Sequence, residues 1–323
     1  MLITGGAGMI GSTIAHLAVA QGAQVSILDA MLPLYGGNRF NLRGILDEVR
    51  FIEGDIRDLD LMRRVVPGCD YIFSLAGQVS YVDSNTEPLL DLDINCKGHL
   101  QVLEACRREN PQAKLLFASS RFVYGRIEYN PVDENHPFNC LSIYGIHKLA
   151  GEKYYRFYHE AYGLKTVSVR IANPYGPRQQ MKHSKYGIVN WFIRLALDGQ
   201  PLTVFGDGQQ HRDYIYNKDL AEGCIALMLS PETEGQVYNL AAAPRCRLSR
   251  WRAWWRRRCP VPNCGRWRGP RIGISSKPGI ISAISPGSPR PRAGGPKPPT
   301  RTGLNAPWLI IVNIRKNTGS RAR

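Results

Sequence analysis

The sequence predicts an α/β fold built on a doubly wound parallel sheet, with a smaller lobe toward its C-terminal side. Short apolar segments alternate with amphipathic segments from residue 1 to about 170, which is typical of parallel sheets covered by helices. A glycine-rich turn follows the first apolar segment, and 323 residues suffice for one large α/β unit or two domains. The expected strands are residues 1–4, 24–28, 49–52, 71–75 and 167–173.

The first turn has the glycine spacing of a Rossmann-type, dinucleotide-binding fold. Gly5 permits a tight turn, Gly8 lets the backbone approach a pyrophosphate, and Gly11 lets the next helix pack closely on the strand. The N–H groups at the start of this helix, expected over residues 12–21, favour an anion. The residues expected to contact the cofactor here are Gly5, Gly8, Met9, Ile10 and Gly11.

The ends of three further strands suit the same cofactor. Asp29 ends the second strand, where a carboxylate accepts both ribose hydroxyls of an adenosine and repels a 2′-phosphate. NAD is therefore favoured over NADP. The third strand leads to residues placed to contact adenine, and the fourth ends in small residues that admit a flat ring. These positions are Asp55 and Ile56 after the third strand and Leu75, Ala76 and Gly77 after the fourth.

Tyr144 and Lys148 form a candidate catalytic pair. Their spacing is about one helical turn, so both side chains lie on one face of a helix expected over residues 144–162. A phenol with a pKa near ~10 is a poor base at neutral pH, and a nearby ammonium favours the phenolate. The pair predicts a proton shuttle whose pKa is lowered toward 7. The same spacing also occurs by chance in exposed helices, so the glycine turn is what favours catalysis.

Seven motifs in order make the chain resemble the extended short-chain dehydrogenase/reductase superfamily. The nearest resemblance is to NAD-dependent epimerase/dehydratases of the UDP-glucose 4-epimerase-like group, over residues 1–243. The motifs are Thr4-Gly-Gly-Ala-Gly-Met-Ile-Gly11, Gly54-Asp-Ile-Arg-Asp58, Asn95-Cys-Lys-Gly98, Ser119-Ser-Arg-Phe-Val-Tyr-Gly125, Tyr144-x-x-x-Lys148, Asn173-Pro-Tyr-Gly-Pro177 and Arg212-Asp-Tyr-Ile-Tyr216.

The resemblance implies a mechanism and a third catalytic residue. Ser120, rather than its neighbour Ser119, would hydrogen-bond the sugar oxygen that is oxidised. Tyr144 would remove that hydroxyl's proton while hydride moves from C4 to the nicotinamide, and Lys148 would lower the Tyr144 pKa and hold the nicotinamide ribose. The resulting 4-keto sugar rotates and hydride returns to its other face, so NAD is regenerated each turn. Asn95 is expected among the cofactor contacts.

The residues after Ser120 favour epimerisation as the net reaction. Dehydratases and decarboxylases of the family tend to carry acidic residues there, whereas this chain has Arg121 and Phe122. A 4,6-dehydratase, a decarboxylase and a 2-epimerase remain alternatives. A further alternative is a catalytically impaired NAD-binding protein whose basic tail binds nucleic acid.

The expected substrate is a nucleotide-diphosphate sugar, most readily a UDP-sugar. Arg212 could clamp the diphosphate through two hydrogen bonds, or could form a surface salt bridge with Asp213. Asn173 ends the last expected strand, next to a turn rich in proline and glycine. The expected substrate contacts are Gln78, Ser80, Ser120, Asn173 and Arg212.

The composition divides the chain into three parts. We expect a NAD-binding domain over residues 1–173, a partial substrate-binding lobe over 174–243 and a basic tail over 244–323. The tail holds 19 of the 42 Lys and Arg residues, none of the 26 Asp and Glu residues and five of the six tryptophans. The net charge of +16 therefore belongs to the tail and is no sign of nucleic-acid binding by the enzyme.

Two interpretations of the tail compete. A basic, aromatic segment can bind RNA, DNA or anionic lipid. A change of reading frame near residue 243 would also give a stretch rich in Arg, Pro, Gly and Trp without acidic residues. We favour the frame change, which would leave the tail disordered and the substrate lobe incomplete.

The sequence also predicts the setting of the protein. The first five of eight cysteines show no pairing pattern, which favours a reducing cytoplasm. The sequence contains no run of ~18 apolar residues, so no membrane span is predicted. Cys259 and Cys264 lack the second pair that a zinc site needs, so no metal is expected. A homodimer is expected through helices near residues 90–107 and 148–162.

Overall fold

A seven-stranded sheet forms the centre of the protein. The computed structural model describes residues 1–185, 187–203, 211–241 and 246–247. The strands lie in the order β10-β6-β5-β4-β1-β2-β3, and every neighbouring pair is parallel. The strands are β1 (Leu2–Thr4), β2 (Val25–Asp29), β3 (Val49–Glu53), β4 (Tyr71–Ser74), β5 (Lys114–Ser120), β6 (Lys165–Ile171) and β10 (Val237–Leu240).

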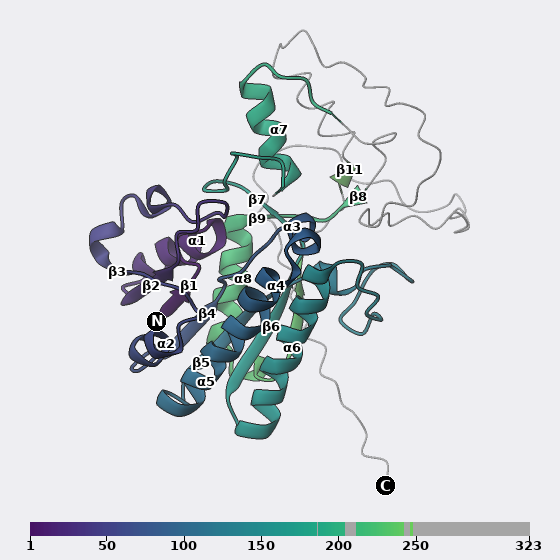
Figure 1. Cartoon of the computed structure of the whole chain (residues 1–323). Helices are drawn as coiled ribbons and strands as arrows, with labels where there is room; N and C mark the ends of the chain where they lie inside the picture. The colour runs from purple at the N-terminus through teal and green to yellow at the C-terminus, as the bar shows by residue number, and fades with distance from the viewer. Residues whose placement is uncertain (186, 204–210, 242–245, 248–323) are drawn as a thin grey trace, which may run out of the picture.

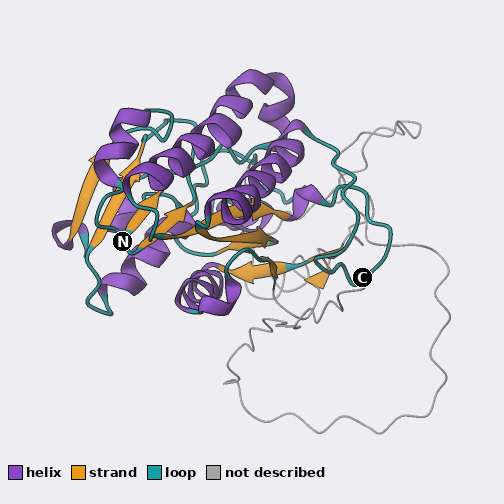
Figure 2. Cartoon of the chain, turned by 90° about the horizontal axis from the view of Figure 1, so that it is seen from below, coloured by secondary structure: helices purple, strands orange, loops and turns teal. Residues whose placement is uncertain are grey.

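Helices cover both faces of this sheet, as Figure 2 shows from below. Because side chains alternate along a strand, Ile3 packs with α1 and α8 on one face, and Leu2 packs with α2, α5 and α6 on the other. The helices are α1 (Met9–Val19), α2 (Leu59–Val65), α5 (His99–Glu109), α6 (Ile143–Tyr162) and α8 (Asn217–Leu229). The predicted doubly wound α/β fold is confirmed.

Several boundaries differ from the predicted ones. α1 begins at Met9 rather than at residue 12, because the glycine turn itself leads directly into the helix. A π-helix, Asp93–Gly98, precedes α5. The expected strand over residues 167–173 is divided, since β6 ends at Ile171 and Asn173 begins β7. β5, whose seven residues are all buried, was not predicted because an apolar run without alternation also suits a buried helix.

Smaller elements gather beyond the carboxyl ends of the strands (Figure 1). Two short sheets pair β7 (Asn173–Tyr175) with β9 (Tyr214–Tyr216) and β8 (His211–Arg212) with β11 (Cys246–Arg247). The helices α3 (Tyr81–Thr86), α4 (Pro88–Leu92) and α7 (Ile188–Leu197) complete this region.

Short 3-10 helices elsewhere in the connections cover Arg39–Leu42, Leu46–Glu48, Arg121–Val123 and Pro231–Thr233.

The predicted division of the chain into domains agrees only in part with the observed packing. Two elements of the segment 174–243, α8 and β10, pack with the large sheet, and β7, α7, β8 and β9 lie toward its carboxyl edge. The boundary at residue 173 stays a prediction. Of the predicted tail, the structure describes residues 246–247, and the interpretations of residues 248–323 lie outside the described residues.

A buried ion pair holds α6 against the sheet. Ser142 caps the helix by accepting a hydrogen bond from the Gly145 N–H at 3.1 Å. Farther along, Arg170 of β6 donates to the Glu152 carboxylate, with 2.8 Å between Nη2 and Oε2. Both side chains are at most 4% exposed, so neither charge has water to replace its partner. The pair therefore fixes the position of α6 relative to β5 and β6.

Replacing Glu152 by alanine tests the importance of this pair. We expect Glu152→Ala to lower the free energy of unfolding by about 3–5 kcal/mol, because it leaves a buried guanidinium without its carboxylate. Glu160→Ala is the matched control. Glu160 pairs with Arg156 on the same helix, and both side chains are more than half exposed. Its expected effect is below about 1 kcal/mol. Urea unfolding of both variants measures the difference, and equal losses would contradict the assignment.

Candidate active site

The carboxyl edge of the sheet collects the predicted site residues. β1 lies between β4 and β2, so the connections diverge at this point of the sheet, where doubly wound folds bind ligands. The glycine turn follows β1, Asp29 ends β2 and Ser120 ends β5. Residues distant in sequence therefore face one region.

The glycine turn is shaped for a close approach of backbone and ligand. Gly5 has a φ of +67°, and a Cβ there would lie 2.8 Å from the backbone of Ala76. A Cβ on Gly11 would lie 2.5 Å from the Gly5 carbonyl oxygen. Gly8 caps α1 without a side-chain hydrogen bond, so the first N–H groups of the helix, which begins at Met9, are available to an anion. The turn has the geometry that a pyrophosphate requires.

Asp29 braces the glycine turn. Its Oδ2 accepts from the Ala7 N–H at 3.0 Å and its Oδ1 accepts from the Met31 N–H at 2.9 Å. Burial raises the pKa of this carboxyl, and the two hydrogen bonds oppose the shift. Each oxygen keeps a second acceptor site, which is what the expected ribose contact would use. That contact stays a prediction.

Asp55 is held by an arginine that was not singled out from the sequence. Arg57 donates from Nη2 to Asp55 Oδ2 at 2.7 Å and from Nε to Oδ1 at 3.0 Å. Burial would raise the pKa of Asp55, but these hydrogen bonds outweigh it and the pKa is lowered. Ile56 is buried in the core, so its backbone is the part that could contact adenine. The spacing of two residues gave no signal for this Asp–Arg pair.

The end of β4 and the π-helix form a narrow cradle. A Cβ on Gly77 would lie 2.9 Å from Asn95 Oδ1 and 3.2 Å from Lys148 Nζ. Asn95 is fully buried and donates from Nδ2 to the Gln78 carbonyl at 3.0 Å and to Asp91 Oδ2 at 3.1 Å. Within the described residues, Asn95 Oδ1 has no hydrogen-bond partner. A buried acceptor beside a space that a methyl group would fill suits a bound cofactor with polar groups.

The predicted residues 75 and 76 are tied to the first strand. The Thr4 hydroxyl accepts from the N–H groups of Leu75 at 3.2 Å and Ala76 at 3.3 Å. This contact joins the end of β1 to the end of β4, and Ala76 is the residue that Gly5 approaches. The backbone at residues 75–77 therefore borders the glycine turn, as the cofactor prediction requires.

Ser120, Tyr144 and Lys148 lie together and are all buried. The side chains of Ser120 and Tyr144 are hydrogen-bonded to each other. Lys148 Nζ lies 5.9 Å from the centroid of the Tyr144 ring and donates to the Ala118 carbonyl at 3.0 Å. Ser119 donates instead to Glu152, on the side of β5 that faces α6. The geometry therefore favours Ser120 over Ser119 as the third member.

Burial dominates the pKa values of this group. It raises the pKa of Tyr144 to about 12, and the hydrogen bond from Ser120 lowers it only in part. The charge of Asp91 raises this pKa further, and that of Arg121 lowers it. Burial lowers the pKa of Lys148 to about 8. The expected net lowering of the Tyr144 pKa is wrong for this structure, because loss of solvent outweighs the nearby positive charge.

Asp91 was not predicted from the sequence. It is fully buried, and its Oδ1 lies 2.6 Å from His147 Nδ1 while Oδ2 accepts from Asn95. Its charge raises the pKa of both Tyr144 and Lys148. The spacing of four residues between Asp91 and Asn95 was the available signal, since it places both on one helical face.

Asn173 and Arg212 come together with Arg121 at the edge of the site. Asn173 Oδ1 accepts from Arg121 Nε at 3.2 Å, and its Nδ2 donates to the Asp213 carbonyl at 3.0 Å. Arg212 donates from Nη1 to the His211 carbonyl at 2.8 Å. Burial lowers the pKa of Arg212. The sequence singled out Asn173 and Arg212 but assigned Arg121 no binding role.

Gln78 and Ser80 shape a loop beside the site. The Gln78 side chain donates to the Ser80 carbonyl at 2.8 Å and accepts from the Ser80 N–H. The Ser80 hydroxyl accepts from the Asp83 N–H at 3.1 Å and so caps α3. These bonds occupy much of their hydrogen-bonding capacity, and the sugar contacts expected of them stay predictions.

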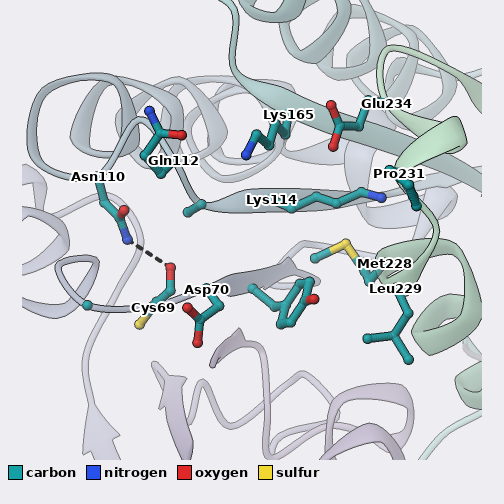
Figure 3. A pocket seen from close by; sticks show the side chains of 13 residues that line it. Cys69, Asp70, Asn110, Gln112, Lys114, Lys165, Met228, Leu229, Pro231 and Glu234 are labelled. Carbon is teal, nitrogen blue, oxygen red and sulfur yellow. Dashed lines mark hydrogen bonds between the residues drawn. The ribbon is translucent and has the colours of Figure 1, made fainter.

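A separate cavity of about 340 Å³ lies at the opposite, amino edge of the sheet (Figure 3). Lys114, at the start of β5, donates from Nζ to the Leu227 carbonyl and to Thr233 Oγ1. Its ammonium also donates to the Ser230 carbonyl and so joins β5 to the end of α8. Because protein acceptors satisfy this cation, we assign the cavity no catalytic role.

Two searches of the described residues bear on the setting of the site. No helix within them is long and apolar enough to cross a membrane. Nor do they bring together three or more His, Cys, Asp or Glu side chains that could hold a metal ion. The pair Cys259 and Cys264 lies outside the described residues.

The fold and the site define a dinucleotide-binding enzyme of the short-chain dehydrogenase/reductase type. A glycine turn lies at the switch point of a parallel sheet, and a tyrosine and a lysine one turn apart lie beside it. Residues 1–241 match the NAD dependent epimerase/dehydratase family, and the chain belongs to this family. Its cofactor is NAD, and the family acts on nucleotide sugars.

Individual relatives include both kinds of enzyme. A putative UDP-glucose 4-epimerase of Methanocaldococcus jannaschii is 38% identical over 242 residues, 74% of this chain and 76% of the relative. A dTDP-glucose 4,6-dehydratase of Mycolicibacterium smegmatis is 31% identical over 75% of this chain and 72% of the relative. The UDP-glucose 4-epimerase of Thermotoga maritima, solved with UDP-glucose, superposes with a TM-score of 0.76 at 30% identity, covering 84% and 86% of the two chains.

Substitution of Gly11 tests the cradle for NAD. We expect Gly11→Ala to weaken NAD binding by about tenfold or more, since its methyl group would collide with the Gly5 carbonyl and shift the turn. Gly36→Ala is the matched control, because nothing lies within 4 Å of a Cβ at Gly36. Isothermal titration of both variants with NAD measures the effect. Unchanged affinity in Gly11→Ala would place the cofactor elsewhere.

Proposed function

We propose that the protein is a NAD-dependent nucleotide-sugar 4-epimerase whose substrate is a UDP-sugar. The family supplies the reaction class, and the relatives named above include 4-epimerases of UDP-glucose. The choice of epimerisation over dehydration depends on the residues next to the catalytic serine.

The observation that carries this choice is the surroundings of Ser120. Arg121 donates to Asn173, and the Phe122 ring packs edge to face on Tyr144 with 5.6 Å between ring centroids. Phe122 also stacks on Tyr81 at 5.3 Å. Elimination of water needs an acid to protonate the leaving hydroxyl. A guanidinium and a phenyl ring occupy the two positions where such an acid would follow the serine.

The reaction assigns each buried residue a task. Ser120 hydrogen-bonds the sugar O4 and Tyr144 takes its proton. When bound, NAD would supply reversible hydride-transfer chemistry at the sugar C4. Lys148, whose lowered pKa lies near neutrality, lies beside the cradle at Gly77 and would hold the ribose next to the nicotinamide. Asn95 and the glycine turn would hold the remainder of the cofactor.

The pKa values of Tyr144 and Lys148 shift in opposite directions, and the shift at Tyr144 affects how readily it takes the proton of the sugar hydroxyl. A phenol of pKa about 12 keeps its proton at neutral pH. The hydrogen bond from Ser120 and the charge of Arg121 both favour the phenolate, so they lower the cost of removing a proton from the sugar. Binding of substrate and cofactor has to supply the rest of the stabilisation that Tyr144 needs to act as a base.

Conversion of UDP-galactose tests the proposal. We expect the purified full chain to form UDP-glucose, and Tyr144→Phe to lower kcat by about 10²–10⁴-fold, because no hydroxyl remains to move the proton. NAD binding should be retained. Tyr162→Phe, an exposed tyrosine of the same helix, is the matched control and should change neither quantity. A 4-keto-6-deoxy product would establish dehydration instead, and full activity of Tyr144→Phe would overturn the assigned base.

The sequence predicts a homodimer through helices near residues 90–107 and 148–162, and we propose a contact on α4, which borders the first range, and on α6, which contains the second. These helices pack together, and Leu89, Ile146 and Phe157 on them are 77%, 49% and 54% exposed. Large apolar side chains gathered on neighbouring helices favour burial against a second copy. We place the dimer contact on this surface.

A cytoplasmic location is also proposed, supported by the free thiols of the five described cysteines.

Introducing a charge on this surface tests the dimer. We expect Phe157→Arg to shift the protein from dimer to monomer in light scattering at micromolar concentration, because a buried guanidinium without a partner disfavours the contact. Phe40→Arg is the control, since Phe40 is 68% exposed on a different part of the protein. A dimer that persists in Phe157→Arg would exclude this surface.

A further inference from the structure

A second arginine reaches the site from the residue that follows the catalytic serine. Arg121 lies with its guanidinium carbon 4.5 Å from the centre of the Phe122 ring, and that ring packs on Tyr144. Its Nε donates to Asn173 Oδ1 at 3.2 Å, at the start of β7. The guanidinium is thereby held between the catalytic tyrosine and the region expected to bind substrate.

The charge of Arg121 is poorly compensated. Burial lowers its pKa to about 10, the nearby charge of Arg212 lowers it as well, and the charge of Asp213 opposes these shifts only in part. The guanidinium therefore stays charged at neutral pH. Within the described part of the chain, no carboxylate lies within ion-pair distance of Arg121, and its one side-chain hydrogen bond is to a neutral amide. Two guanidinium groups in one region, partly removed from water, favour an anionic ligand.

One anion of a nucleotide sugar is its diphosphate, which is attached at C1. The reacting carbon, C4, lies across the ring from C1, and Tyr144 marks its position. Arg212 is the residue expected at the diphosphate. Arg121 adjoins Ser120 and Tyr144, so it faces the substituents next to C4, of which C6 is the one that carries a charge when it is oxidised to a carboxylate.

The geometry points to a uronic acid as the sugar: we propose that Arg121 pairs with the C6 carboxylate of a nucleotide-linked hexuronate. This specificity rests on the proposed 4-epimerase function. Since Nε is bound to Asn173, the two Nη groups remain to grip the two carboxylate oxygens, a pairing that a planar guanidinium makes well. Among the described residues, a neutral hexose would leave Arg121 with only the charge of Asp213, which lies beyond ion-pair distance, to oppose its own.

Equilibrium binding to the NAD-loaded full chain tests the proposal. The nucleotide is chosen first, as the diphosphate among UDP, GDP, dTDP and CDP that raises Tm most. On that nucleotide, the glucuronate and the glucose derivatives are compared by calorimetry. We expect the wild type to bind the glucuronate about 10- to 100-fold more tightly, the range of a hydrogen bond to a charged group.

Variants assign this preference to Arg121. Arg121→Leu should remove it while leaving the affinity for the nucleoside diphosphate and for the glucose derivative within about threefold. Arg121→Gln, which keeps a donor for Asn173, should lose the preference equally and shows whether the loss follows the charge or the fold. Arg43→Leu, an exposed arginine, is the control.

The outcomes separate this proposal from the reaction itself. Equal affinity of the wild type for the two sugars overturns it, and so does a loss of diphosphate affinity in Arg121→Leu, which would place Arg121 at the diphosphate. Failure of every diphosphate to bind overturns it as well. If the preference is present but no C4 inversion occurs, the 4-epimerase function falls and the carboxylate site stands.

Discussion

The buried ion pair between Glu152 and Arg170 determines where α6, the helix with the predicted catalytic pair, lies. Glu152 accepts from Arg170 on β6 and from Ser119 on β5, so one carboxylate joins α6 to two strands. Arg170 also donates to the Tyr124 hydroxyl, which in turn donates to Asn239 on β10. A charge buried at such cost is tolerated only where all its partners are in place. With α6 held in this way, Tyr144 meets Ser120 at the end of β5.

Desolvation is the second constraint, and it shifts the pKa values of the two predicted catalytic groups, Tyr144 and Lys148, in opposite directions. It raises the pKa of the Tyr144 phenol and lowers that of the Lys148 ammonium, so both are pushed toward their neutral forms. Asp91 opposes this at Lys148 and reinforces it at Tyr144. At a pKa of about 8 the Lys148 ammonium stays mostly charged at neutral pH while the phenol keeps its proton, so the ammonium remains available to stabilise a phenolate.

The spacing of residues in the sequence was sufficient to predict those parts of the structure where only one residue type fits a given position. The glycine turn was predicted because Gly5 and Gly11 have no room for a side chain, and the alternation of apolar segments predicted the sheet. Ser120, Tyr144 and Lys148 were predicted through their motifs and lie together. Roles that depend on tertiary contact were missed, namely those of Asp91, Arg57 and Arg121. The sign of the Tyr144 pKa shift was wrong because burial depends on packing that no spacing reveals.

The buried face of α6 carries two properties at once. Tyr144 and Lys148 occupy its first turns, and Glu152 and Tyr155 continue the same buried stripe toward the core. A displacement of this helix along its axis would move Tyr144 and Lys148 away from Ser120 and would also disrupt the core contacts of Glu152 and Tyr155. Evolution of activity and evolution of folding are thus not independent along this helix. New specificity is more readily acquired at Arg121 or on β7, which border the predicted substrate region and are not part of the buried core.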